Sequence, residues 1–230
     1  MREYLRDIIE LFYPRICCGC GTPLLNGEDI ICLNCHIKLP RTEFEFQPEN
    51  PVEKLFWGRL PIQHASSFLY FRKNGLSQRL IHQLKYKGHF EIGYHLGYLF
   101  GQEIKSSFLK LNIDFIAAVP LHPSKIKQRG YNQSDEIAKG FSSATEIPFF
   151  PNLIRRTEST ETQTKKKRYH RWENIENKFE LNPGIDIQNK HILLIDDVIT
   201  TGATLEACGK SILEIKKAQL SIASLCFAIN

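Results

Sequence analysis

The segment HILLIDDVITTGATL at residues 191–205 constrains the fold more than any other part of the chain. A run of apolar residues is followed by two adjacent carboxylates, Asp196 and Asp197, and then by a small, hydroxyl-rich turn and a helical pattern. This order predicts a buried strand that leads through a tight turn into a helix, which is typical of α/β proteins. Because ligands of such proteins lie beyond the carboxyl ends of parallel strands, we expect the acid pair to lie at a binding site.

The turn after the acid pair is suited to bind a phosphate group. Its residues place backbone N–H groups and hydroxyls at a helix N-terminus, where the helix dipole also favours an anion; they are Thr200, Thr201, Gly202, Ala203 and Thr204. The two carboxylates can accept hydrogen bonds from neighbouring sugar hydroxyls. Capping of a turn and a helix is the alternative, but adjacent acids are costly in a partly desolvated strand. The segment therefore predicts a sugar-phosphate pocket.

The cysteines predict a second site near the N-terminus. Two CxxC pairs are formed by Cys17, Cys20, Cys32 and Cys35. Four thiolates from two such pairs suit the tetrahedral geometry of Zn²⁺, whereas disulfides fit poorly because the seven cysteines are an odd number and a cytoplasmic thiol pool is reducing. We predict a structural zinc ribbon, with an iron centre or a nucleic-acid reader as alternatives. Cys18 is spare, and His36 would be a ligand only if one cysteine faced away.

The remaining chain alternates helical and strand patterns. Helices are expected at residues 76–86, 92–108, 132–145 and 204–215, and strands at residues 67–71, 114–119, 191–195 and 219–228, with an extended segment at 148–154. The predicted fold is α/β, a Rossmann-like parallel sheet with helices on both faces and a small zinc ribbon before it. We expect three parts: a helix and ribbon at 1–45, a linker at 46–61 and the main domain at 62–230.

Composition and charge narrow the class of protein. With 42% hydrophobic and 24% charged residues among 230, the chain has the composition of a folded protein. Its longest apolar stretches, such as 115–121, are far shorter than the roughly 18 residues of a membrane span, and charges interrupt the first sixteen residues, so we expect a cytoplasmic protein. Seven basic and two acidic residues at 155–171 account for the net charge of +5, which predicts an anion site or an exposed basic loop there.

The strand, acid pair and threonine-rich turn resemble the PRPP-binding signature of type I phosphoribosyltransferases. Three further elements narrow the resemblance to the ComF family of competence-associated, phosphoribosyltransferase-like proteins: LKYKG at 84–88, VPLHPSKIKQRGYNQ at 119–133, and the spaced Thr160, Gln163, Arg171, Asn174 and Phe179. The two CxxC pairs also fit the plan of that family. Ala118 replaces a common second proline and Lys166 a usual leucine, so the basic loop is more basic than in the family.

The resemblance implies a role for each motif. Asp196 and Asp197 would hold the ribose hydroxyls of PRPP, and the threonine-rich turn its 5-phosphate. The place of the pyrophosphate loop is taken by Pro120, Leu121, His122 and Pro123. Mg²⁺ would bridge pyrophosphate and ribose oxygens, so dedicated protein ligands for it are not expected. The implied reaction is displacement of pyrophosphate from C1 of PRPP by an unidentified acceptor, in a protein associated with competence and DNA uptake.

Catalysis of that reaction would depend on positioning and on cations directed at the leaving pyrophosphate. The candidates beside the acid pair are Lys85, Arg129 and Arg171. The family loops add Gly130, Tyr131, Asn132, Gln133, Gln163 and Asn174. Simple helix capping by Asn132 or Ser134 is the alternative for the residues after Arg129. The candidate small-molecule partner is PRPP or a related ribose phosphate.

Two other functions remain open from the sequence. The basic run at 165–168, with Tyr169 and Trp172, would suit a non-catalytic protein that binds single-stranded DNA in natural transformation. The same run would otherwise close over substrate or form a solvated face. A PRPP-sensing module is the third hypothesis, and competence-machinery proteins are the candidate macromolecular partners.

Overall fold

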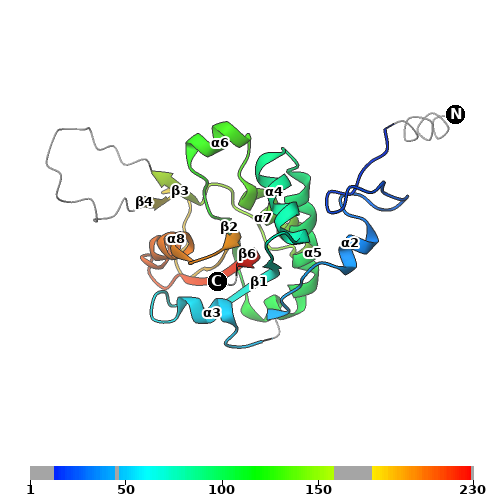
Figure 1. Cartoon of the computed structure of the whole chain (residues 1–230). Helices are drawn as coiled ribbons and strands as arrows, with labels where there is room; N and C mark the ends of the chain where they lie inside the picture. The colour runs from blue at the N-terminus through cyan, green and yellow to red at the C-terminus, as the bar shows by residue number, and fades with distance from the viewer. Residues whose placement is uncertain (1–12, 45–46, 158–177, 229–230) are drawn as a thin grey trace, which may run out of the picture.

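The computed structural model describes residues 13–44, 47–157 and 178–228. Its centre is a four-stranded sheet in the order β1 (His64–Phe71), β6 (Gln219–Ala228), β5 (His191–Ile199) and β2 (Phe115–Ala118), in which every pair is parallel (Figure 1). A two-stranded antiparallel sheet pairs β3 (Ile154–Thr157) with β4 (Lys178–Leu181). The parallel sheet predicted from the sequence is thus confirmed.

Helices cover both faces of the sheet. Successive strand residues point to opposite sides, so each strand contributes side chains to two cores. Leu193 and Ile195 face a core formed with α4 (Leu76–Tyr86), α5 (Glu91–Phe108) and α7 (Gln133–Thr145). Ile192 and Leu194 face the opposite core, which includes α3 (Pro51–Phe56) and α8 (Ala203–Leu213). The shorter helical elements are α2 (Leu33–Ile37), α6 (Pro123–Arg129) and the 3₁₀ turn η2 (Leu109–Leu111).

The register of β5 places the acid pair at an edge of the sheet. On one side β5 pairs with β2 only as far as Ile195, and the N–H of Val119 donates to the Ile195 carbonyl at 2.9 Å. On the other side β5 continues along β6 to Ile199. The strand therefore extends beyond the predicted end at Ile195. Asp196 and Asp197 lie within it, directly after the last residue of β5 that pairs with β2.

The described part of the predicted linker contains a helix that belongs to the core. Asn50 caps α3 by accepting hydrogen bonds from the N–H groups of Val52 and Glu53, at 2.9 and 3.1 Å. Val52 and Phe56 are completely buried. A six-residue helix is less than two turns long, so it leaves no periodic pattern to recognise. The division of the chain into domains stays a prediction, and residues 1–12, where the helix before the ribbon is expected, lie outside the described residues.

Helices α5 and α7 approach each other closely through glycines. A Cβ atom added at Gly97 would lie 2.2 Å from the backbone oxygen of Ile137, and one added at Gly140 would lie 2.0 Å from that of Tyr94. Both distances are far below any real Cβ contact, so the two backbones touch. This packing fixes α7, whose N-terminus reaches the acid pair.

The close helix contact predicts a stability effect. Gly140→Ala should lower the free energy of unfolding by about 1–3 kcal/mol, because the added methyl group forces two backbones apart. Urea unfolding followed by circular dichroism measures the change. Gly184→Ala is the matched control, since its added Cβ meets no atom closer than 3.7 Å. Equal stability of the two variants would contradict the described packing.

Candidate functional site

Asp197 forms an ion pair with a lysine from a distant helix. The Nζ atom of Lys85, in the last turn of α4, lies 2.9 Å from Oδ1 of Asp197. The two side chains are only 20% and 15% exposed, so the pair is shielded from most of the solvent. The structure therefore brings together two of the residues that the sequence analysis assigned to the same site.

Asp196 has different partners. Its Oδ1 accepts hydrogen bonds from Oγ of Ser134 at 3.1 Å and from the N–H of Asp197 at 2.8 Å. Burial, followed by the charge of Asp197, raises the pKa of Asp196 to about 7. The sequence alone indicates Ser134 only as a candidate helix cap, because nothing in the local sequence shows that the start of α7 meets the end of β5.

The threonine-rich turn exposes a helix N-terminus. Gly202 precedes α8 with a φ of +72°, and a Cβ there would lie 3.0 Å from the ring of Phe56, so both conformation and space require glycine. Thr200, Thr201 and Ala203 are exposed, whereas Thr204 is half-buried. The turn can thus offer backbone N–H groups and hydroxyls to an anion from the solvent.

The loop after β2 follows the strand next to the acid pair. Pro120, Leu121 and His122 are half-buried, and Pro123 begins α6. His122 caps that helix, as its Nδ1 accepts from the N–H of Ser124 at 3.2 Å. Because β2 and β5 are neighbours, this loop and the acid pair share one edge of the sheet. Its role toward pyrophosphate stays a prediction.

The segment from the end of α6 to the start of α7 connects three helices. Arg129 donates to Oε1 of Gln133 at 2.6 Å, and its guanidinium lies 5.1 Å from the ring centroid of Tyr86. The hydroxyl of Tyr131 donates to the carbonyl of Leu84. Asn132 caps α7 through Ser134 N–H at 3.3 Å and donates to the carbonyl of Val119 at 3.0 Å, so the expected cap is confirmed.

Gly130 ends α6 in the left-handed conformation, with a φ of +83°. These contacts give residues 129–133 a clear role in holding α4, α6 and α7 together beside the acid pair. A direct action of Arg129 on a leaving group stays a prediction. Gln163, Arg171 and Asn174 lie outside the described residues, as does the basic run at 165–168.

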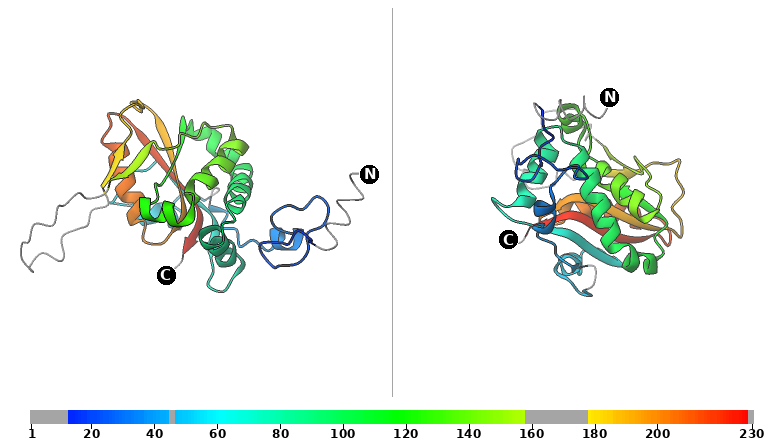
Figure 2. Two further views of the ribbon diagram at one scale, coloured as in Figure 1. Left: turned by 90° about the horizontal axis from the view of Figure 1, so that it is seen from above. Right: turned by 90° about the vertical axis from the view of Figure 1, so that its right-hand side faces the viewer.

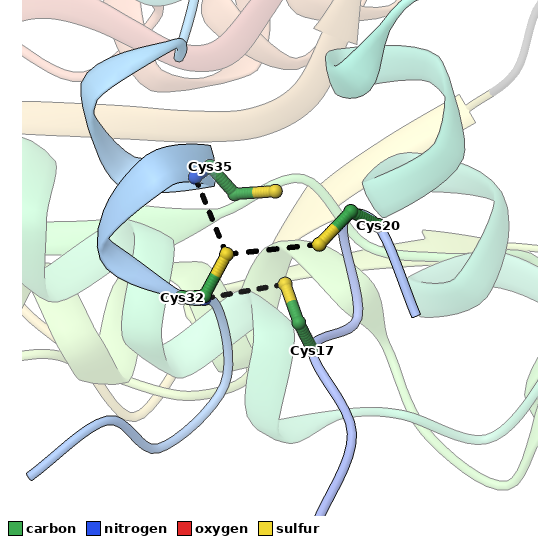
Figure 3. A group of neighbouring side chains, drawn as sticks. All are labelled: Cys17, Cys20, Cys32 and Cys35. Atoms are coloured by element: carbon green, nitrogen blue, oxygen red, sulfur yellow. Dashed lines mark hydrogen bonds between the residues drawn. The ribbon is translucent and has the colours of Figure 1, made fainter. Parts of the chain in front are cut away.

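The four predicted cysteine ligands gather at one point (Figure 3). The sulfur atoms of Cys17, Cys20, Cys32 and Cys35 all lie within 4.8 Å of one another. The N–H groups of Gly19 and Cys32 donate to the sulfur of Cys17, at 3.3 and 3.2 Å, and the N–H of Cys35 donates to the sulfur of Cys32 at 3.5 Å. Such donors stabilise thiolates, so the cluster is suited to bind a metal ion.

The surroundings of the four sulfurs are not alike, and burial raises the pKa of Cys35 above the ordinary thiol value. Hydrogen bonds from the side chain and then the backbone of Thr22 lower the pKa of Cys20 to about 6, which favours its thiolate. Neither Cys18 nor His36 belongs to the sulfur group found in the described part of the chain. His36 lies instead against Arg41, with Nε2 and Nη2 at 3.3 Å.

The four-cysteine segment packs beside the helical face of the main body (Figure 2). Arg79 on α4 donates from Nε to the carbonyl of Gly19 at 2.9 Å, and Gln83 donates to the carbonyl of Cys18. Arg41 reaches α5, where its Nε lies 2.7 Å from Oε1 of Glu103. The cysteine loop and the acid pair are therefore linked through α4, which carries both Gln83 and Lys85.

The sequence of this chain is similar to those of known proteins. Residues 126–229 match the phosphoribosyl transferase domain. The chain is 32% identical over 151 residues to the DNA utilization protein YhgH of Escherichia coli, covering 64% of this chain and 65% of YhgH, just under two thirds of its length. It is also 27% identical over 216 residues to the competence protein ComFC of Bacillus subtilis, covering 93% of this chain and 78% of ComFC.

The chain carries a phosphoribosyltransferase-type domain and is a homologue of a DNA utilization protein and of a competence protein. Competence protein F of Haemophilus influenzae is a further relative, with 29% identity over 153 residues and coverage of 65% of this chain and 67% of the relative. Among solved structures, adenine phosphoribosyltransferase from Saccharomyces cerevisiae matches with a TM-score of 0.35 and 16% identity, covering 60% of this chain and 69% of the enzyme. None of the described helices combines the length and apolar character needed to cross a membrane.

The environment of Asp196 predicts a pH-dependent stability. Its raised pKa means that the folded protein binds a proton more tightly than the unfolded chain between pH 3.8 and about 7. The ionisation of Asp196 therefore lowers the free energy of unfolding as the pH rises through this range. Asp196→Asn removes this effect, so the stability of the variant relative to the wild type should increase with pH. Urea unfolding at several pH values measures it.

Glu206→Gln is the control of opposite sign. Hydrogen bonds from Lys210 and Arg59 lower the pKa of Glu206, so its charge stabilises the fold at neutral pH and this contribution is lost as the pH falls below 4.5. The relative stability of Glu206→Gln should therefore decrease as the pH rises. Parallel curves for the wild type and Asp196→Asn would contradict the assigned environment of Asp196.

Proposed function

We propose that the acid pair and the threonine-rich turn bind PRPP. The observation that carries this proposal is the sequence of groups along one strand and turn: a carboxylate paired with Lys85, a second held by Ser134, and an exposed helix N-terminus a few residues later. Carboxylates suit the ribose hydroxyls and the helix N-terminus suits the 5-phosphate. The phosphoribosyl transferase domain match supports the same ligand class.

The proposed reaction is displacement of pyrophosphate from C1 of PRPP by an acceptor. As the bond to C1 breaks, positive charge develops on the ribose and negative charge on the pyrophosphate. Asp197 would accept hydrogen bonds from ribose hydroxyls, and Lys85 would direct its charge to the pyrophosphate side, where the loop at 120–123 lies. Mg²⁺ would neutralise pyrophosphate oxygens when bound with PRPP, and its preference for phosphate, carboxylate and water oxygens fits this edge of the sheet.

The relatives indicate a biological setting. Two are competence proteins and one is a DNA utilization protein by name, so we propose that the phosphoribosyltransferase activity serves DNA uptake or use. We further propose a cytoplasmic location, where the reduced state of the cysteines, all of them free, would be maintained.

Binding of PRPP tests the proposal. Isothermal titration calorimetry should detect PRPP binding that depends on Mg²⁺, and Asp197→Asn should weaken it at least about tenfold, the effect of losing one charged hydrogen-bond partner. Asp186→Asn is the matched control, because Asp186 precedes β5 at the opposite end of the strand. PRPP binding that is equally strong in Asp197→Asn would contradict the proposed site.

Release of pyrophosphate separates an enzyme from a sensor. With PRPP, Mg²⁺ and a panel of acceptors such as nucleobases and amines, an enzyme releases pyrophosphate in step with loss of PRPP. Tight PRPP binding without pyrophosphate release for any acceptor would favour the sensing module instead.

We also propose that the four-cysteine cluster binds Zn²⁺ as a structural ion. Four sulfurs at this spacing suit the ion, since Zn–S bonds of about 2.3 Å place tetrahedral sulfurs nearly 4 Å apart. Zn²⁺ would supply folding free energy to a segment with little apolar core of its own.

Metal analysis tests this cluster. The purified protein should contain one Zn²⁺ per chain, and Cys32→Ser should lose it and unfold at a lower temperature. Cys18→Ser is the matched control, because Cys18 lies outside the sulfur group. Equal zinc content in both variants, measured by mass spectrometry of metals, would contradict the assignment.

A further inference from the structure

Arg59, in the segment after α3, contacts the threonine-rich turn through its guanidinium group. Its Nη1 donates to the carbonyl of Thr201 at 2.9 Å and to that of Leu55 at 3.1 Å. Its Nε and Nη2 both donate to Oε2 of Glu206, at 2.9 and 2.6 Å. A single guanidinium thus joins α3, the turn and the first turns of α8.

Glu206 makes the position of this arginine important. It follows Ala203 by three residues, so its carboxylate lies close to the helix N-terminus that would receive the phosphate. A negative charge at that point repels an anion. Arg59 neutralises one oxygen of Glu206, and Lys210 lies 2.8 Å from the other. The ion pair with Arg59 is about one-third exposed at the arginine and one-fifth at the glutamate.

The carbonyl of Thr201 is the second group whose effect on an anion Arg59 controls. Carbonyl oxygens repel phosphate, whereas N–H groups attract it. The hydrogen bond from Arg59 holds this carbonyl toward α3, and the packing of Phe56 against Gly202 supports the same face of the turn. Thr200 and Ala203 are exposed and stay accessible to a ligand.

We propose that Arg59 is a positioning residue for the phosphate-binding turn. It fixes the Thr201 carbonyl away from the anion and screens the charge of Glu206, without touching the ligand itself. This inference rests on the proposed function for the identity of the anion, but it assigns a task to a segment that the sequence analysis treated as a linker.

Binding of ribose 5-phosphate tests the two tasks separately. By calorimetry, Arg59→Ala should bind this probe roughly tenfold more weakly than the wild type, because Glu206 loses one of its two cationic partners beside the anion. Adding Glu206→Gln should restore part of the affinity, because it removes a charge that Lys210 alone would then screen, while the unfixed turn keeps the double variant below the wild type. A merely structural role would give no such recovery.

Arg41→Ala is the matched control. Arg41 also donates from Nε to a glutamate, Glu103 at 2.7 Å, and from Nη1 to a carbonyl, that of His36 at 3.1 Å, but on the cysteine-rich side of the molecule. It should bind ribose 5-phosphate like the wild type. Unchanged affinity in Arg59→Ala, or no recovery on adding Glu206→Gln, would overturn the proposed screening.

Hydrogen–deuterium exchange of the ligand-free protein keeps the two proposals distinguishable. Arg59→Ala should speed exchange of the amides at 200–204 about tenfold or more, whereas Arg41→Ala should leave them unchanged. A wild type that binds neither ribose 5-phosphate nor PRPP contradicts the proposed function. In that case, faster exchange still supports the fixing of the turn by Arg59, and unchanged exchange overturns it.

Discussion

Two adjacent carboxylates in one partly buried strand are the constraint on which this site depends. Like charges on adjacent residues destabilise each other unless each has a partner. Here the two partners come from different helices. Lys85 reaches Asp197 from the end of α4, and Ser134 reaches Asp196 from the start of α7. The positions of both helices on the same face of the sheet are therefore tied to the chemistry at its edge.

The regular elements could be predicted from the sequence because each carries its own periodic signal. The helix at Leu76–Tyr86 and the strand at Gln219–Ala228 have the predicted bounds, and the four sulfurs meet as their spacing indicated. The pattern of apolar residues records which face of each element is buried, and the CxxC spacing records a local turn. Neither kind of signal depends on the rest of the chain.

The contacts between elements could not be predicted in the same way. Lys85 and Asp197 are 112 positions apart and Arg59 and Glu206 are 147 apart, and no local pattern marks either pair. The helix α3 was missed because it is too short to show a period, yet its burial brings Arg59 to the threonine-rich turn. Sequence patterns thus predict the groups of a ligand site, a prediction that stays open, but they do not show the residues that hold those groups in place.

Helix α4 contacts both the cysteine loop and the acid pair. Its Arg79 and Gln83 donate hydrogen bonds to the backbone of the cysteine loop. Lys85, two residues after Gln83, forms the ion pair with Asp197 of β5. A slip of this helix by one residue would move all three groups by about 1.5 Å and rotate them by about 100°. The cysteine loop therefore fixes the position of α4, and the proposed sugar-binding edge depends for its alignment on a cluster of sulfurs on another side of this helix.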